Sequence, residues 1–582
     1  MVNPNIVAQA EDWLRHAPDP ETRAELAPLV AERASELEER FAGPLEFGTA
    51  GLRGVLGAGE SRMNRAVVRR ASAGRGRYLL DHTPARDGKR SVVVGYDGRR
   101  MSREFAAETA AVLCAAGIET HLSNKLCPTP IVAFGVRELG AAAGVMVTAS
   151  HNPPAYNGYK VYAANGAQII PPTDKRIAEA IAHTGPADTV PVLELGAATE
   201  RGLLHPIGEP LDQRYLDTVL SLVPARGGNR ALPIAYTPMH GVGHRLMRRA
   251  FELAGFTAVE TVAEQAEPDG AFPTVTFPNP EEPGALDLAV ALARRIDAAL
   301  VVANDPDADR LAICVRRAPG DYRQLSGNEV GVLLGHHLLE RHAALGAERL
   351  VVTTIVSSPA LGAMARELGA QYAETLTGFK WIANRAMQLE ASGKAQFIFG
   401  YEEALGYTVG TAVRDKDGIS AALVLCALAA ELDAQGKSLL DRLDEIAVRF
   451  GLFESAQRSV VLPGRDGVEH MARIMAELRR EPPSELAGHS VAAVVDCQTG
   501  KRQQRGQQPA PIELPPSNVL VFELAGGHRV IARPSGTEPK IKFYFDVREP
   551  VASVAEVGTA RERARRQLGA LERALLARVG LG

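Results

Sequence analysis

Short apolar runs, each followed by a polar loop and then by an amphipathic stretch, recur along much of the chain. The run in SVVVGYDGRRMS precedes a predicted helix over residues 102–116, PIAYTPMHGVG precedes one over 244–254, and RLVVTTIVSS precedes one over 359–368. Strands that alternate with helices of this length predict mostly parallel sheets covered by helices. Ligand sites in such sheets lie beyond the carboxyl ends of the strands, which is where the polar loops of this chain fall.

The two ends of the chain have different patterns. Residues 28–41, with Glu and Arg on one face, predict a helix near the N-terminus. Near the C-terminus three apolar runs predict paired strands, over residues 519–524, 529–532 and 541–547. A long helix rich in Ala, Arg, Glu and Leu is predicted after them, over residues 551–579. Residues 499–517 are polar and proline-rich and predict an exposed loop.

A chain of 582 residues is too long for a single hydrophobic core. Passages rich in glycine and proline are the candidate joints between domains. The pattern predicts an α/β fold class with three α/β domains and a smaller C-terminal fourth domain. The predicted bounds are 1–205, 206–325, 326–455 and 456–582.

The composition is that of a soluble globular protein, with 46% apolar and 23% charged residues. The net charge of −4, from 65 basic and 69 acidic residues, gives no overall field that would favour nucleic acid or an anionic membrane. The five cysteines have no C-x-x-C spacing, which argues against a zinc knuckle or a disulfide framework. The N-terminus lacks the pattern of a secretion signal, and the longest apolar run, over 421–430, is too short for a membrane span. We therefore expect a cytoplasmic protein with no nucleic-acid or membrane partner.

The stretch GVMVTASHNPPAYNGYKV, residues 144–161, is the one around which the rest of the chain is expected to be organised. Its apolar beginning predicts a buried strand that delivers Ser150 and His151 into a turn, since the following Asn-Pro-Pro cannot continue a helix. Ten residues after the serine, Lys160 opens another apolar stretch and could return an ammonium group beside it. The pattern predicts a serine nucleophile with a cation near it, although a serine that only caps its own turn would give the same local sequence.

The loop NDPDADR follows the apolar run over residues 300–302 and places three aspartates at alternate positions, Asp305, Asp307 and Asp309. Alternate residues of an extended chain share a side, so the three carboxylates would converge and repel one another unless a cation lies among them. Three carboxylate oxygens together with a phosphate oxygen would suit Mg²⁺. An EF-hand is excluded, because Arg310 stands where that loop needs glycine.

Two further loops offer groups for a polyol. GYEEALGY follows an apolar strand and places Glu402 and Glu403 between glycines, where they could bind vicinal hydroxyls or act in general acid-base catalysis. TGFKWI adds Lys380 beside an aromatic ring. Each of these signals is weak in isolation.

Phosphate recognition is predicted near the C-terminus. RPSGTEPKIK offers an arginine, two hydroxyls and glycine-freed amides at the end of a strand, in the residues Arg533, Ser535, Gly536 and Thr537. That combination suits a phosphate monoester. Near the other end, FGTAGLRG places Arg53 among three glycines, which allow the backbone to approach a ligand closely. Neither a Walker motif nor a dinucleotide fingerprint is complete in this sequence.

Taken in order, TASHNPP with Lys160, DPDADR, GYEEALG and RPSGTEPK resemble the four active-site segments of the α-D-phosphohexomutases, the family of phosphoglucomutase and phosphomannomutase. The resemblance covers essentially the whole chain. It implies three related mixed-sheet α/β domains and a C-terminal TBP-like α+β domain. The forms GYEEALGY and GFKWI, and the chain length, resemble the longer phosphoglucomutase-2-like branch.

The resemblance also implies a role for each residue. Ser150 would carry a phosphoryl group, and it would bind Mg²⁺ together with Asp305, Asp307 and Asp309. Arg310 would contact the phosphoryl group, His151 would line the centre, and Arg53 and Lys160 would flank it, one of them helping to move the proton. The substrate would be bound by Lys380, Glu402, Glu403, Arg533, Ser535, Gly536 and Thr537.

The implied reaction interconverts glucose 1-phosphate and glucose 6-phosphate, with mannose phosphates as further candidates, through a phosphoserine and a bisphosphorylated sugar. Glucose 1,6-bisphosphate would act as primer, and the protein would be a monomer or homodimer. The sequence departs from many family members in having Ala404 where they have serine, so one hydroxyl contact is missing. The alternatives are a phosphopentomutase, a glucose 1,6-bisphosphate synthase, a phosphatase and a non-catalytic sugar-phosphate-binding protein.

Overall fold

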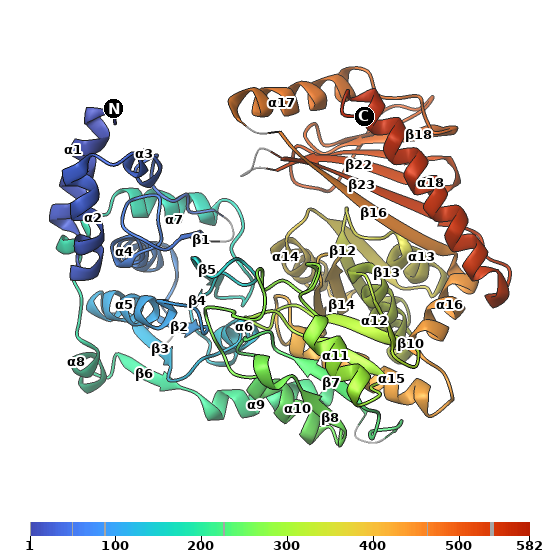
Figure 1. The fold of residues 1–582 in the computed structure, drawn as a ribbon, viewed down its shortest axis with the longest axis horizontal. Helices are drawn as coiled ribbons and strands as arrows, with labels where there is room; N and C mark the ends of the chain where they lie inside the picture. Colours follow the sequence, from blue (N-terminus) through green and yellow to red (C-terminus); the bar gives the residue numbers. More distant parts are fainter. Residues whose placement is uncertain (1, 49–50, 86–88, 225–226, 463, 536–539) are drawn as a thin grey trace. The chain divides into compact units, whose positions relative to one another are not determined.

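The computed structural model of this protein describes residues 2–48, 51–85, 89–224, 227–462, 464–535 and 540–582 (Figure 1). The chain divides into two compact units. Unit 1 comprises Met1–Leu325 and Gly406–Gln435, and unit 2 comprises Ser326–Leu405 and Gly436–Gly582. The chain therefore leaves unit 1, returns to it for one segment and leaves it again.

Three helices at the N-terminus of unit 1 share a small apolar core of their own. They are α1 (Pro4–His16), α2 (Pro20–Glu32) and α3 (Glu36–Arg40). The single helix predicted over residues 28–41 is wrong. Arg33 adopts a left-handed conformation, with a φ of 50°, and its N–H bonds back to carbonyls of the last turn of α2. This arrangement ends α2 before α3 begins.

The first sheet of unit 1 has six strands in the order β1-β5-β4-β2-β3-β6. The strands are β1 (Leu52–Val55), β2 (Ser91–Tyr96), β3 (Glu119–Ser123), β4 (Ala143–Val147), β5 (Tyr156–Ala163) and β6 (Leu204–Ile207). The sheet is mixed, because β2, β3, β4 and β6 pair in parallel whereas β5 is antiparallel to both β4 and β1. The accompanying helices are α4 (Arg65–His82), α5 (Ser102–Ala115), α6 (Thr129–Glu138), α7 (Thr173–Ala182) and α8 (Leu195–Glu200), with the short turn η1 (Ala187–Thr189).

The second sheet of unit 1 has five strands in the order β11-β10-β9-β7-β8. The strands are β7 (Ile234–Thr237), β8 (Val259–Thr261), β9 (Leu300–Ala303), β10 (Ala312–Ala318) and β11 (Asp321–Gln324). β7, β8 and β9 pair in parallel, and β10 is antiparallel to β9 and β11. The accompanying helices are α9 (Glu209–Ser221), α10 (His244–Leu253) and α11 (Asp287–Arg295).

The segment that returns to unit 1 contains β15 (Gly406–Val409) and α15 (Gly418–Asp433). Helix α15 contains the longest apolar run of the chain, and its residues 418–430 are all buried. A helix that is apolar on every side is stable only where protein surrounds it, and α15 packs against α10 and β15. Of the helices that the structure describes, none combines the length and the apolar sequence that crossing a membrane would need.

The first part of unit 2 contains three strands in parallel, in the order β13-β12-β14. They are β12 (Arg349–Thr354), β13 (Gln371–Thr375) and β14 (Gln396–Glu402). The helices of this part are α12 (Gly327–Arg341), α13 (Ala360–Glu367), α14 (Phe379–Glu390) and α16 (Leu439–Phe450). The helix predicted over residues 359–368 is therefore confirmed as α13, which begins and ends one residue inside the predicted bounds.

The C-terminal part of unit 2 is an eight-stranded sheet with two long helices. Its strands are β16 (Leu452–Val461), β17 (Glu485–Leu486), β18 (His489–Asp496), β19 (Lys501–Gln504), β20 (Ala510–Pro511), β21 (Leu520–Leu524), β22 (Arg529–Pro534) and β23 (Lys540–Glu549). Its helices are α17 (Gly464–Arg480) and α18 (Val557–Arg578). Figure 1 shows α18, in red, running along β16 and β23, and their apolar side chains form one core.

Two predictions in this part need correction. The long helix begins at Val557 rather than at residue 551, after a short 3-10 turn over Val554–Glu556. The predicted loop over residues 499–517 contains the antiparallel pair β19 and β20 at the edge of the sheet. β19 is polar and β20 has only two residues, both exposed, so neither strand gives the alternating apolar pattern from which a strand is predicted.

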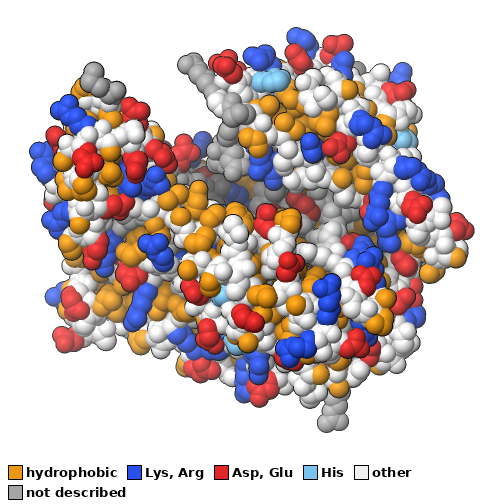
Figure 2. Space-filling model, viewed as in Figure 1, with side chains coloured by type: hydrophobic (Ala, Val, Ile, Leu, Met, Phe, Trp, Pro, Cys, Tyr) orange, Lys and Arg blue, Asp and Glu red, His pale blue; other side chains and the backbone are white. Residues whose placement is uncertain are grey.

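The predicted fold class is confirmed, because three α/β domains are followed by a C-terminal α+β domain. Figure 2 shows basic and acidic side chains interspersed over the face in view, which agrees with the nearly balanced charge of the sequence. The polar loops that the sequence singles out lie at the carboxyl ends of β4, β9 and β14.

Candidate active site

Ser150 lies in the turn after β4, where the chain reverses into β5. Its φ of 51° is left-handed, a conformation that non-glycine residues seldom adopt and that often occurs at functional sites. The serine is 3% exposed, and its Oγ donates a hydrogen bond of 2.8 Å to Asp305 Oδ2. His151 Nδ1 lies 3.2 Å from the same Oγ. The hydroxyl is therefore held against the first of the three predicted aspartates.

Asp305, Asp307 and Asp309 follow β9 and are completely buried. They converge as predicted, with one carboxylate oxygen from each within 4.8 Å of the others. The reason is different from the expected one, because the loop is a turn, with Ala308 at a φ of 56°, rather than an extended strand.

This carboxylate cluster has the properties of a cation site. One oxygen each of Asp307 and Asp309 is buried and has no hydrogen-bond partner within the described part of the chain. Burial, followed by the two neighbouring carboxylates, raises the pKa of Asp305 well above its ordinary value. A divalent cation would remove both problems, since it would bind the unpartnered oxygens and keep all three groups ionised. The residues present therefore fit Mg²⁺.

Two lysines contact the far side of the cluster. Lys160 on β5 donates to Asp307 Oδ2 at 2.7 Å and to Asp309 Oδ2 at 2.8 Å. Burial would lower the pKa of Lys160, but the two carboxylates outweigh it and the pKa is raised. Lys160 therefore bonds to two aspartates of the cluster against which Ser150 Oγ is held, and its direct contact with the serine stays a prediction. The second lysine, Lys416, has its Nζ 3.2 Å from Asp309 Oδ2.

Sequence reasoning missed Lys416 and the residues that hold it. Lys416 Nζ lies 3.3 Å from Asp415 Oδ1, and the other oxygen of Asp415 accepts hydrogen bonds from Tyr162 Oη at 2.8 Å and Gln168 Nε2 at 2.7 Å. The segment RDKDG before α15 is the available signal, since it is a polar loop directly before a long apolar helix. Thr129 was also missed; its Oγ1 donates to Asp307 Oδ2 at 2.5 Å.

A buried arginine fixes the loop that carries Ser150. Arg99 follows β2 and donates to the carbonyl oxygens of Ser150 at 2.6 Å, Pro153 at 2.9 Å and Tyr156 at 3.2 Å, and also to that of Asn152. Its own N–H bonds to Asp97 Oδ1. Sequence reasoning did not identify this arginine, which holds four carbonyl groups of a single loop.

The remaining predicted residues of unit 1 surround the same loop. Arg53, on the exposed side of β1, donates to Asn152 Oδ1 at 3.1 Å. The backbone N–H of Arg310 donates to Asp305 Oδ1 at 2.9 Å, and its Nε lies 4.0 Å from Asp309 Oδ1. Burial, then Arg310 and Arg53, lower the pKa of His151 well below its ordinary value. Unit 1 thus brings together every candidate that the sequence placed around the serine.

The predicted sugar-binding residues lie in unit 2. Glu402 Oε1, at the end of β14, accepts a hydrogen bond of 2.7 Å from the N–H of Gly378, two residues before Lys380. Glu403 Oε2 accepts a hydrogen bond of 3.1 Å from Ser357 Oγ. The Nζ of Lys380 lies 5.7 Å from the centroid of the Trp381 ring. The GYEEALGY and TGFKWI loops are therefore joined by a hydrogen bond from a backbone N–H to a glutamate side chain.

Arg533 and Ser535 lie at and just beyond the end of β22, while Gly536 and Thr537 fall outside the described residues. Burial, followed by Glu403, raises the pKa of Tyr544 to about 12, and Arg533 opposes this shift. Glu402 acts on the same hydroxyl. Within unit 2, the acidic pair and Arg533 therefore act in opposite directions on the pKa of one tyrosine.

Comparisons with known proteins agree with this arrangement. Family models described as phosphoglucomutase/phosphomannomutase, alpha/beta/alpha domains I, II and III, match residues 44–187, 213–320 and 326–450. The chain is 42% identical over 490 residues to a protein of Haemophilus influenzae named probable phosphomannomutase, covering 84% of this chain and 93% of that protein. It is 38% identical over 566 residues to a protein of Schizosaccharomyces pombe named probable phosphoribomutase, covering 94% of each. Its fold is similar to that of parafusin, a phosphoglucomutase from Paramecium, with a TM-score of 0.67, 18% identity and coverage of 92% of this chain and 95% of that one.

Proposed function

The chain belongs to the phosphoglucomutase/phosphomannomutase family and is a sugar-phosphate mutase, an intramolecular phosphotransferase; on this premise we propose that it interconverts glucose 1-phosphate and glucose 6-phosphate, with mannose phosphates as further substrates. The observation that carries the proposal is the 2.8 Å hydrogen bond between Ser150 Oγ and Asp305. It holds a hydroxyl against three buried carboxylates, which is the pairing that a phosphoserine and its metal ion require.

The proposed chemistry begins with a phosphoryl group on Ser150 Oγ. A hydroxyl oxygen of the sugar phosphate forms a bond to phosphorus and the bond from phosphorus to Ser150 Oγ breaks. The hydroxyl proton replaces the phosphoryl group on Ser150 Oγ, with Arg53 or Lys160 helping to move it. The bisphosphorylated sugar then presents its other phosphoryl group, which returns to Ser150. Arg310 contacts the moving group, and His151, kept neutral, lines the centre. Mg²⁺ held by Asp305, Asp307 and Asp309 would supply neutralisation of phosphoryl charge.

The residues of unit 2 would bind the part of the substrate that does not react. Glu402 and Glu403 would accept hydrogen bonds from sugar hydroxyls, and Lys380, Arg533 and Ser535 would bind the second phosphate. Gly536 and Thr537 are proposed for the same phosphate on sequence grounds. A sugar that binds in two orientations needs hydroxyl contacts that tolerate reversal, and a pair of carboxylates provides them.

The second candidate is a phosphopentose mutase of the same mechanism. It is favoured by the match to the relative named probable phosphoribomutase, which extends over 94% of both chains. Ala404 supports the same candidate, since the absence of a serine hydroxyl in the GYEEALGY loop would weaken the binding of a hexose.

A side-by-side rate comparison tests the two candidates. The kcat/KM values for glucose, mannose, ribose and deoxyribose 1-phosphates are measured with a bisphosphate primer. The proposal expects glucose 1-phosphate to exceed both pentose phosphates at least tenfold, and the reverse order would establish the second candidate instead. Inorganic phosphate is measured in parallel, because steady release would indicate a phosphatase, and absence of turnover on all four sugars would indicate a binding protein.

A further inference from the structure

Unit 1 contains a cavity of about 280 Å³ that is separate from the residues around Ser150. Its wall is formed by α1, by α4, by the chain before and within β1, and by the segment after α7. The family model for domain I begins at residue 44, so α1 lies outside the part of the chain that the model covers. This cavity therefore depends on a segment additional to the family domain. Its volume is near the lower end for small-ligand sites, which begin at about 300 Å³.

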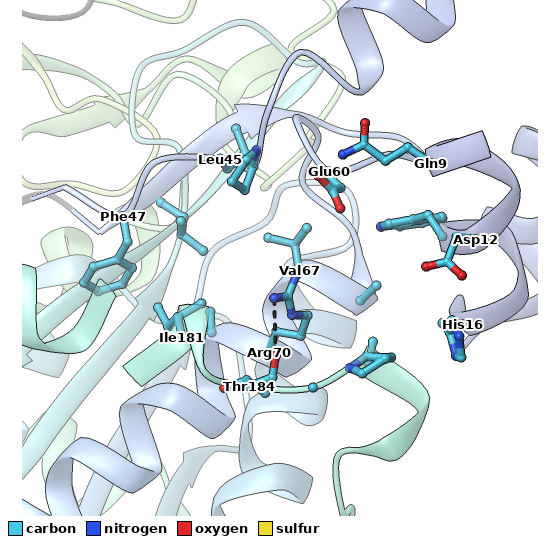
Figure 3. A pocket seen from close by; sticks show the side chains of 18 residues that line it. Gln9, Asp12, His16, Leu45, Phe47, Glu60, Val67, Arg70, Ile181 and Thr184 are labelled. Carbon is cyan, nitrogen blue, oxygen red and sulfur yellow. Dashed lines mark hydrogen bonds between the residues drawn. The ribbon is translucent and has the colours of Figure 1, made fainter. Parts of the chain in front are cut away.

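One end of the cavity is apolar, and the other end, at α1, is lined by polar side chains together with Trp13 (Figure 3). Figure 3 shows Leu45, Phe47 and Ile181 at the apolar end. Gln9, Asp12 and His16 project from α1 at the other end, and Arg70 lies between the two ends. Such a wall favours a ligand with an apolar body and a charged head.

The charges on the polar side differ in whether they are already paired. Asp12 bonds to Arg15 at 2.5 Å, and His16 bonds to Asp188 at 3.0 Å. Arg70 instead donates only to the carbonyl oxygen of Thr184, at 3.3 Å, and its buried Nε has no partner among the residues that the structure describes. Arg70 therefore lines the cavity with a charge that no carboxylate of the described residues balances, so this position favours an anion.

Glu60 also lines the cavity, and no ion pair joins its carboxylate to any cation in the described part of the chain. We propose that the cavity binds an α-amino acid with an aromatic or large apolar side chain. The ligand carboxylate would accept hydrogen bonds from Arg70, its ammonium group would bond to Glu60, and its side chain would lie against Phe47, Leu45 and Ile181. This ligand class uses both unpaired charges and both ends of the cavity.

Binding of a ligand in the cavity would affect the loop that contains Ser150. Leu52 of β1 lines the cavity, and the next residue, Arg53, points to the opposite side of the strand, because side chains alternate along a strand. Arg53 contacts Asn152, two residues after Ser150. A ligand against Leu52 would therefore shift the strand that positions Arg53. This regulatory consequence rests on the proposed function, whereas binding does not.

Calorimetric titration of the full-length protein with L-tryptophan tests the site in the absence of sugar phosphate. The expected result is saturable binding of one molecule per chain. Tryptamine, which lacks the carboxylate, and indole-3-propionate, which lacks the ammonium group, should each bind at least tenfold more weakly, the loss expected of a charged hydrogen bond. Binding of neither L-tryptophan nor L-phenylalanine at millimolar concentration would overturn the proposal, as would equal binding of all three indoles.

Variants locate the ligand. Arg70→Met should weaken L-tryptophan binding at least tenfold, whereas Arg77→Met, on the exposed side of the same helix, should leave it unchanged. Glu60→Gln provides a second test if Arg70→Met does not fold. Binding that survives both changes would overturn the proposal. Saturating L-tryptophan should also change kcat at least twofold in the wild type but not in Arg70→Met; an unchanged wild-type kcat would overturn the regulatory part alone.

Discussion

Replacing Arg99 by lysine should slow turnover without unfolding the protein. The guanidinium group holds the carbonyl groups of four residues in the Ser150 loop. A lysine keeps the charge but has a single nitrogen on a flexible stem, so it cannot reproduce the fork of contacts. Each charged hydrogen bond contributes about 1.5–3 kcal/mol. If the substitution removes the free energy of one such bond from the positioning of the loop, kcat should fall by about tenfold to a hundredfold. Roughly 1.4 kcal/mol corresponds to a factor of ten in rate.

The assay is kcat and KM in a coupled assay of glucose 6-phosphate formation, with thermal melting of each variant to establish that it is folded. Arg100→Lys is the matched control, because Arg100 is the next residue and is exposed. Asp97→Asn is a second perturbation of the same arginine, since it removes the carboxylate charge whose Oδ2 lies 3.6 Å from Arg99 Nε. The reasoning is refuted if Arg99→Lys and Asp97→Asn are both folded and have kcat values within twofold of the wild type.

Three further predictions concern the carboxylate cluster and its neighbours. Ser150→Ala should abolish turnover in the coupled assay because the phosphoryl carrier is removed, and near-normal activity would contradict the assignment. Chelation with EDTA should stop turnover and added Mg²⁺ should restore it, because two buried carboxylate oxygens lack partners among the described residues; indifference to EDTA would count against the cation site. Lys416→Met should lower kcat at least tenfold by removing a cation 3.2 Å from Asp309, whereas the exposed Lys394→Met should not, and equal effects of the two changes would argue against a specific role.

The loops that contain the candidate site residues could be predicted because the end of an apolar run in the sequence marks the end of a buried strand. Ser150 and the three aspartates each follow a buried apolar run, and the structure places both loops where those runs end. The convergence of the aspartates was also predicted, but from an extended chain. A left-handed residue at position 308 produces it instead, and alanine gives no sequence signal for that conformation.

Other parts could not be predicted because their signals are generic or distant. Arg99 and Lys416 belong to polar loops 51 and 266 residues from Ser150, and only tertiary packing reveals what their side chains contact. The left-handed conformation of Arg33 ends a helix where the sequence pattern predicted that one helix would continue. The three predicted domain boundaries, the roles of the individual site residues and the preferred sugar stay predictions.

The return of residues 406–435 to unit 1 has a consequence for biosynthesis. Lys416 and the mostly apolar α15 belong to unit 1, yet both are translated after about eighty residues of unit 2 have emerged from the ribosome. A nascent chain of residues 1–325 would expose the surface that α15 later covers, and exposed apolar surface invites aggregation or chaperone binding. The half of the protein that contains the serine is therefore completed late, and no single cut of the gene would yield it intact.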